Sequence, residues 1–195
     1  MVGLATVFGA GGGTSSYEEV EHTDLMLLWG SNARAAHPIY FHHVLKGIRN
    51  GMRLIVVDPR RTESAEWGDL WLGLDVGTDI ALSNTMAREI IVNDLHHRAF
   101  IELATTDFED YASSVMDWTL ERGAEVTGIP AEVIREVAHA FAKAPQRRQI
   151  VGRGQKVVAD ARRIARIEPL PPSPPGTALR LVCASRWHGS DSRPA

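Results

Sequence analysis

Short apolar runs alternate with longer amphipathic segments along most of the chain. Residues 25–29 are continuously apolar, and residues 54–57 form a second run that is rich in β-branched residues. Continuous apolar runs of this length are typical of parallel strands that are buried on both faces. A weaker strand is predicted at residues 70–74, and a further strand begins at residues 149–151.

The segments between these runs carry apolar residues at helical spacing. Tyr40, Val44 and Ile48, for example, repeat every four residues and share one face of a helix. Strands that alternate with helices predict an α/β fold, a Rossmann-like parallel sheet flanked by helices. Helices are expected at 17–22, from 33 to about 50, from 78 to about 90, at two places within 97–116, and from 130 to about 141.

The character of the sequence changes near residue 154. Six of the ten prolines fall within residues 169–195, mixed with arginine, serine and glycine. Such a segment buries too little apolar surface to offset the entropy lost on ordering. Residues 1–154 are therefore interpreted as one α/β domain, and residues 155–195 as a disordered Pro/Arg-rich tail.

Composition limits the class of protein. Hydrophobic residues make up 44% and charged residues 23% of the 195 residues, which is typical of a globular protein with a core. No apolar run approaches the ~20 residues that span a bilayer, and the N-terminus lacks the basic segment of a secretory signal. We therefore expect a cytoplasmic protein with no membrane partner, and a net charge of −3 does not favour a nucleic-acid partner.

Few residues are suited to hold a metal. Cys183 is the single cysteine, so this chain alone cannot hold an iron–sulfur cluster. The histidine pairs at 42–43 and 96–97 are adjacent in sequence, and adjacent residues on a helix point in different directions. No metal site and no catalytic residue is predicted.

The candidate chemistry lies in turns that follow the predicted strands, where parallel sheets bind ligands. Gly30-Ser31-Asn32 follows the first strand, and backbone N–H groups at the start of the next helix can bind a phosphate. Asp58 and Arg60 follow the second strand, where an acid can bind ribose hydroxyls and an arginine can bind a phosphate. Both turns also have ordinary structural explanations: a generic strand–helix turn, and a capping aspartate beside solvated arginines.

A third turn, Gly77-Thr78-Asp79, precedes the helix expected from residue 78. Thr78 is placed to cap that helix, and the charge of Asp79 would stabilise its first turn. The carboxylate of Asp79 can also accept hydrogen bonds from the ring N–H and the exocyclic amine of guanine, a pair of donors that distinguishes guanine from adenine. Both explanations remain open on the residues alone.

Four blocks of sequence, in their order and spacing, resemble the molybdopterin oxidoreductase superfamily that contains dimethyl sulfoxide reductase. The blocks are residues 6–24, 28–32 together with Ala-His-Pro at 36–38, 56–62 and 77–79. The similarity covers residues 3–150 and is strongest to the large subunit of formate dehydrogenases. In that family this α/β domain binds one of two molybdopterin guanine dinucleotides.

The resemblance implies a role for each turn. The residues that would contact the pyrophosphate are Gly30, Ser31 and Asn32, with His37 beside them; those facing the guanosine are Asp58 and Arg60; those facing the guanine are Gly77, Thr78 and Asp79. Ser15 departs from the family pattern, which often has asparagine at that position, so a pterin contact there is in doubt.

The resemblance also implies that parts of the family's machinery are missing. The cysteines for the iron–sulfur cluster and the cysteine or selenocysteine that binds molybdenum would lie upstream of Met1. A second nucleotide-binding domain would follow the matched region, and the basic tail resembles a foreign or frame-shifted ending. The intact family oxidises formate to CO2 at molybdenum and passes two electrons to an iron–sulfur relay.

We therefore expect a fragment of a formate dehydrogenase-like enzyme, which supplies one half-site for the guanosine part of molybdopterin guanine dinucleotide and is not catalytic alone. Its partners would be the missing domains or another subunit. One alternative is a non-catalytic subunit that completes a split oxidoreductase. The other is an unrelated α/β nucleotide-binding module.

Overall fold

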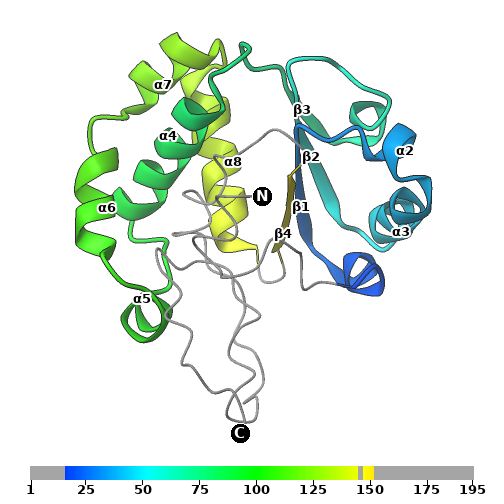
Figure 1. Cartoon of the computed structure of the whole chain (residues 1–195), viewed down its shortest axis with the longest axis horizontal. Helices are drawn as coiled ribbons and strands as arrows, with labels where there is room; N and C mark the ends of the chain where they lie inside the picture. Colours follow the sequence, from blue (N-terminus) through cyan, green and yellow to red (C-terminus); the bar gives the residue numbers. More distant parts are fainter. Residues whose placement is uncertain (1–15, 145–146, 152–195) are drawn as a thin grey trace, which may run out of the picture.

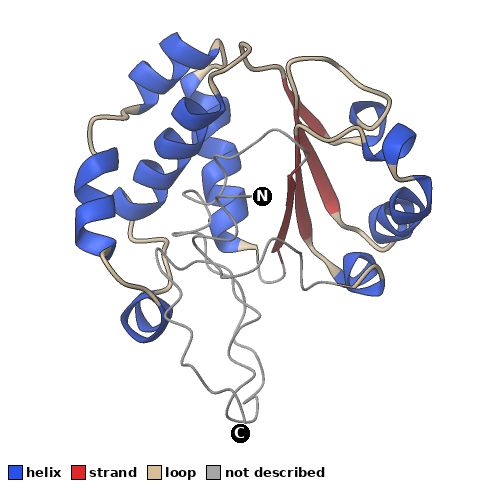
Figure 2. Ribbon diagram, viewed as in Figure 1, coloured by secondary structure: helices blue, strands red, loops and turns tan. Residues whose placement is uncertain are grey.

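A computed structural model describes residues 16–144 and 147–151. Four parallel strands form one sheet in the order β3-β2-β1-β4, and helices cover both of its faces (Figure 1, Figure 2). The α/β fold with a parallel sheet flanked by helices is therefore confirmed. The strands are β1 (Leu25–Trp29), β2 (Arg53–Val57), β3 (Leu70–Leu72) and β4 (Arg147–Val151).

The order of the strands reverses direction at β1. The chain adds β2 and β3 on one side of β1 and later returns to add β4 on its other side. In sheets of this kind, ligands bind beyond the carboxyl ends of the strands near such a reversal. The turn after β1 is therefore the first place in the fold to look for a site.

One face of the sheet is covered by the N-terminal helices. The 3-10 helix η1 (Glu18–His22) packs against α3 (Pro38–Arg49), and the short helix α2 (Ala33–Ala36) precedes α3. Alternate residues of β1 point into this layer. Its buried residues are Val20, Met26, Leu28, Ala33, Tyr40, Phe41, Val44, Met52, Leu54, Val56 and Ala65.

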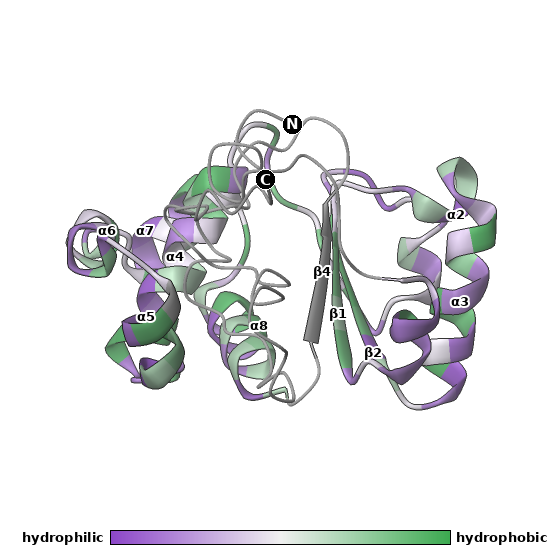
Figure 3. Cartoon of the chain, turned by 60° about the horizontal axis from the view of Figure 1, so that its bottom comes forward, coloured by the Kyte–Doolittle hydropathy of each residue, from purple (hydrophilic) through white to green (hydrophobic). Residues whose placement is uncertain are grey.

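A larger helical layer covers the opposite face. It contains α4 (Asp79–Val92), α5 (Arg98–Ala104), α6 (Phe108–Val115), α7 (Leu120–Thr127) and α8 (Ala131–Lys143). Figure 3, coloured by hydropathy, shows that β1 and β2 are largely hydrophobic between the two layers. The strand residues buried toward this larger layer are Leu25, Leu27, Trp29, Ile55, Val57 and Leu72. No helix of the described residues is long and apolar enough to cross a membrane.

The single helix expected from residue 33 to about residue 50 is wrong, because two helices occupy this segment. The break is at His37, whose φ of −140° and ψ of 65° are not helical. Pro38 follows, and proline disfavours the helical conformation of the residue before it. Proline is tolerated at the first position of a helix, so α3 begins at Pro38.

The apolar pattern also fails to predict α7. This helix buries one large apolar side chain, Leu120, together with Gly123 and Thr127. A Cβ at Gly123 would lie 2.4 Å from Oγ1 of Thr85 on α4, so glycine allows the two helices to approach closely. Gly128, with φ of 73° at the C-cap, is the one local signal that marks the end of α7.

Glu89 joins α4 to α8 as a buried carboxylate with 7% of its side chain exposed. Its Oε1 lies 3.0 Å from Nε2 of His139 and 3.6 Å from Nε of Arg135, both on α8. Asn93 donates to the same oxygen at 3.0 Å. We call these four residues the Glu89 cluster; buried polar groups are tolerated when they are paired in this way.

Candidate functional site

The turn after β1 brings several donors to one edge of the sheet. Gly30 has a φ of 56°, a conformation that glycine adopts without steric cost. Its N–H donates to the Val57 carbonyl at 2.7 Å, which ties this turn to the end of β2. The following backbone N–H groups, of Ser31, Asn32 and Ala33, donate to no described residue. Successive N–H groups of this kind can bind an anion.

The side chain of Asn32 is held by a residue from the loop after β2. Oγ of Ser64 donates to Oδ1 of Asn32 at 3.0 Å and accepts from the backbone N–H of Arg34 at 3.0 Å. Ser64 is fully buried, whereas Asn32 is partly exposed. The hydroxyl of Ser64, in the loop after β2, therefore fixes the side chain of Asn32 in the turn after β1.

Asp58 occupies the corresponding place at the end of β2 and is 6% exposed. Its Oδ1 accepts from the backbone N–H of Arg60 at 2.9 Å, which stabilises the turn. The turn-stabilising explanation of Asp58 is thus confirmed. Its other carboxylate oxygen, Oδ2, has no hydrogen-bond partner among the residues that the structure describes.

Strand β3 fixes the backbone of Asp58 from the other side. The Asp58 N–H donates to the Leu72 carbonyl at 3.1 Å, and the indole N–H of Trp71 donates to the Asp58 carbonyl at 2.9 Å. The backbone N–H and carbonyl of Asp58 are therefore each paired, and Oδ2 is its polar atom without a hydrogen-bond partner among the described residues.

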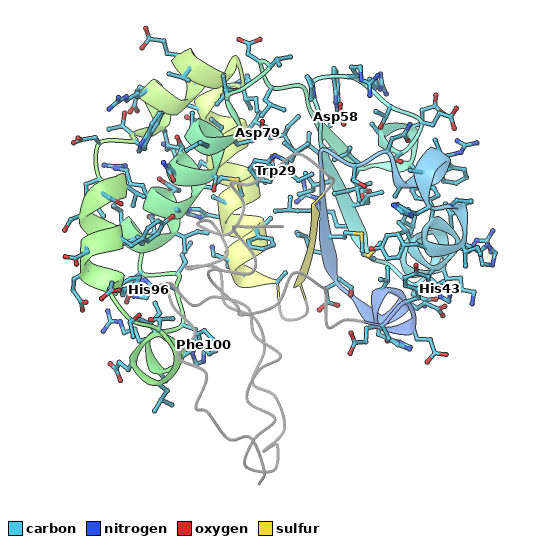
Figure 4. All side chains as sticks on the ribbon, in the orientation of Figure 1. Trp29, His43, Asp58, Asp79, His96 and Phe100 are labelled. Carbon is cyan, nitrogen blue, oxygen red and sulfur yellow. The ribbon has the colours of Figure 1, made fainter. Side chains whose placement is uncertain are left out.

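Asp79 lies at the start of α4 and is tied to the last residue of β1. Nε1 of the buried Trp29 donates to Oδ1 of Asp79 at 2.8 Å, across 50 positions of sequence. A buried indole N–H usually needs such a partner. The bond places Asp79 next to the carboxyl end of β1, and Figure 4 shows Asp58 and Asp79 toward the same end of the sheet.

The turn before α4 is held by its own hydrogen bonds. Gly77 has a φ of 87° and open space where a Cβ would be. Thr78 occupies the N-cap position, but its Oγ1 donates to the Asp75 carbonyl at 2.7 Å and makes no capping bond to α4. Thr78 is therefore at the expected N-cap position, but its side-chain oxygen accepts no hydrogen bond from the first N–H groups of α4, so the expected side-chain capping bond is absent.

His37 and Arg60 are less closely integrated into this edge. His37 is exposed between α2 and α3, and its side chain has no hydrogen-bond partner in the part of the chain that the structure describes. The side chain of Arg60 is also exposed. The structure thus brings the turns at 30–32, 58–60 and 77–79 to one edge, which we call the carboxyl edge, but does not fix these two side chains there.

Sequence reasoning missed the residues that hold the carboxyl edge in place. Ser64, Trp29 and Trp71 each donate a hydrogen bond to a predicted site residue. Trp29 carried a signal, because an indole at the end of a buried strand needs an acceptor. Ser64 gave none, since a serine in a loop is ordinarily solvated.

His43 and His96, each adjacent to another histidine in the sequence, lie in different surroundings. His43 contacts Glu21, and the hydrogen bond from Lys46 is the main cause that lowers the pKa of Glu21 below its ordinary value. Burial lowers the pKa of His96, whose Nδ1 is buried without a partner among the described residues. The described residues contain no group of three or more potential metal ligands.

The sequence matches the molybdopterin oxidoreductase family over residues 6–166. The chain belongs to this family. The match extends past residue 154, where the α/β domain was expected to end, and the Gly-rich stretch at 9–14, Ser15 and the tail from residue 155 lie outside the described residues. Membership argues against the alternative of an unrelated nucleotide-binding module.

Formate dehydrogenases are among its relatives. The chain is 36% identical over 154 residues to formate dehydrogenase H of Escherichia coli, covering 79% of this chain and 22% of that protein. It is 38% identical over 144 residues to the alpha subunit of F420-dependent formate dehydrogenase 2 of Methanococcus maripaludis, covering 74% and 21%. The chain therefore spans about a fifth of the length of these relatives.

A solved structure gives the same picture of the fold. Acetylene hydratase from Pelobacter acetylenicus superposes with a TM-score of 0.61 and 30% identity, over 74% of this chain and 21% of that chain. The names of these relatives describe different reactions. Membership in the family therefore implies a molybdopterin cofactor but does not identify a substrate.

Proposed function

We propose that this chain supplies one half-site for the guanosine part of molybdopterin guanine dinucleotide in a formate dehydrogenase-like oxidoreductase. The observation that carries the proposal is the convergence of three turns with polar side chains on the carboxyl edge. Their order along the chain is the order that the resemblance to the family requires.

The donors after β1 suit the pyrophosphate. The N–H groups of Ser31, Asn32 and Ala33 and the side-chain amide of Asn32 supply hydrogen bonds and no negative charge. Helix α2 has only four residues, so its dipole adds little, and the N–H groups themselves would do the binding. The ring of His37 would approach the pyrophosphate, and the exposed guanidinium of Arg60 the guanosine, only when the cofactor is bound.

The two aspartates suit the nucleoside. Oδ2 of Asp58 is an acceptor for a ribose hydroxyl, and Gly77 and Thr78 would border the guanine. The Asp79 carboxylate would accept from the ring N–H and the exocyclic amine of guanine. A carboxylate offers about four acceptor positions, so the bond from Trp29 does not by itself preclude contacts with guanine.

When bound, molybdopterin guanine dinucleotide would supply the metal centre at which the reaction takes place. We assign to this chain only the binding and orientation of the nucleotide end. The metal ligand, the iron–sulfur relay and the second half of the nucleotide site would come from further domains or from another subunit. We expect the assembly to act in the cytoplasm and to use formate.

The test is retention of molybdopterin guanine dinucleotide by the full chain after gel filtration, measured by pterin absorbance. Asp79→Asn keeps an oxygen that accepts from Trp29 but replaces the second acceptor with an NH2 group that opposes the guanine donors. We expect this variant to lose at least about tenfold in retention. Asp110→Asn on α6, where Asp110 is exposed, is the matched control and should retain as much as the wild type. Equal retention by Asp79→Asn and the wild type would refute the assignment.

A further inference from the structure

The side chain of Ser64, in the loop after β2, forms a hydrogen bond with the side chain of Asn32 in the turn at 30–32. Its hydroxyl is fully buried and contacts two groups, the N–H of Arg34 and Oδ1 of Asn32, both at 3.0 Å. The contact crosses 32 positions of sequence. No other polar contact of the Ser64 side chain exists in the described residues.

We propose that Ser64 is a positioning residue that fixes the side-chain amide of Asn32 with its Nδ2 donor directed toward an anionic phosphate. The identity of that anion rests on the proposed function. The orientation of the amide rests only on the hydrogen bonds around Ser64.

The hydroxyl determines the orientation because its own hydrogen bonds have a fixed direction. The backbone N–H of Arg34 can only donate, so Oγ of Ser64 accepts this bond. The hydroxyl proton then needs an acceptor, and Oδ1 of Asn32 is the acceptor within reach. If the amide were rotated by half a turn, Nδ2 would face Ser64 and leave a buried hydroxyl proton without an acceptor, which is unfavourable.

A fixed amide matters because its two ends have opposite effects on a phosphate. Nδ2 donates hydrogen bonds, whereas Oδ1 would repel phosphate oxygens. Nδ2 of Asn32 has no acceptor among the described residues, so this donor remains available beside the N–H groups of Ser31 and Ala33. A serine that holds Oδ1 therefore selects the binding orientation in advance, which reduces the ordering cost when the ligand arrives.

The first test compares the affinity of the full chain for guanosine and for GDP, since the difference between the two reports the phosphate contacts alone. Ser64→Ala should weaken GDP binding by about tenfold and leave guanosine binding within about twofold. A general loosening of the fold would weaken both ligands equally, and that result would overturn the proposal. Ser83→Ala, which removes another fully buried hydroxyl, is the control and should change neither affinity.

A second variant keeps the bond to Ser64 and reverses the outward group. Asn32→Asp still offers an oxygen to the Ser64 hydroxyl but presents its other carboxylate oxygen to the phosphate. It should therefore lose more GDP affinity than Ser64→Ala while guanosine still binds. In an Asn32→Ala background, Ser64→Ala should cause no further loss of GDP affinity; a full additional loss would contradict an action through Asn32.

A measurement without ligand separates this proposal from the proposed function. The side-chain NH2 signals of Asn32 in the nuclear magnetic resonance spectrum should show a rigid group in the wild type and a mobile one in Ser64→Ala. If neither guanosine nor GDP binds the wild type, the proposed function fails, and this measurement still decides whether Ser64 orders the amide. Equal rigidity in both proteins would overturn the inference about Ser64.

Discussion

Glu89 and Asp58 are buried to the same degree, since 6% of each residue is exposed, but their surroundings differ. Oε1 of Glu89 faces three side chains, those of His139, Arg135 and Asn93. Asp58 accepts one backbone hydrogen bond and has no cationic partner among the described residues. A buried carboxylate that faces cationic or ionisable side chains of its own protein stabilises a fold, whereas one at the carboxyl edge that faces none is suited to bind a ligand.

The largest effect should come from breaking the Glu89 cluster. Glu89→Leu removes the shared acceptor and should lower the free energy of unfolding by about 3 kcal/mol, because His139 and Asn93 lose their buried partner. Denaturation in urea measures this change. Glu132→Gln is the matched control, since Glu132 pairs with Arg135 from an exposed position and should change stability by less than about 0.5 kcal/mol. Similar losses in both variants would show that Glu89 has no special structural role.

A smaller loss of stability is expected from substitution of Trp29, which joins the core to the carboxyl edge. Trp29→Phe keeps an aromatic ring but removes the indole donor to Asp79, and should lower the free energy of unfolding by about 1–2 kcal/mol. The same change at the exposed Trp67 is the control and should have little effect on the urea midpoint. A Trp29→Phe chain as stable as the wild type would mean that this hydrogen bond does not hold Asp79.

Replacing each carboxylate with its amide compares the contributions of Asp58 and Glu89 to stability. Asp58→Asn keeps an oxygen for the Arg60 N–H and should change stability by less than about 0.5 kcal/mol, whereas Asp58→Ala should cost about 1 kcal/mol. Glu89→Gln should be more costly than Asp58→Asn, because two cationic or ionisable partners face Glu89. Thermal unfolding of the three variants decides the order, and a smaller loss in Glu89→Gln than in Asp58→Asn would contradict the comparison.

The smallest expected effect is on the pH dependence of stability. Burial lowers the pKa of His96 below its ordinary value of 6.5, so the unfolded chain binds a proton at this residue more readily than the folded chain. Stability should therefore fall as the pH drops below about 6.5. His96→Phe should reduce this loss by less than about 1 kcal/mol between pH 8 and pH 5.5, as measured by urea unfolding. An unchanged pH dependence would show that His96 does not contribute.

The strands and most helices follow from the sequence because they depend on local apolar patterns. Residues 25–29 and 54–57 are continuously apolar, and the structure buries them between two helical layers. The two errors have local causes that override periodicity. Pro38 ends one helix before it starts the next, and α7 packs through Gly123 rather than through an apolar face.

The candidate site was only partly predictable. The turns could be located, because they follow recognisable strands and carry glycine with polar side chains. The supporting bonds from Ser64 and Trp29 join residues 32 and 50 positions apart, and no local pattern encodes such contacts. The sequence therefore predicts which residues lie at the carboxyl edge, and the structure adds how their side chains are oriented.

We propose that the carboxyl edge recognises a guanine nucleotide. The most direct measurement is the ratio of dissociation constants of the full chain for ADP and GDP, determined by calorimetry in the wild type and in Asp79→Asn. We predict that the wild type binds GDP at least about tenfold more tightly than ADP and that Asp79→Asn abolishes this preference. Equal affinities of the wild type for the two nucleotides would contradict guanine recognition at the carboxyl edge.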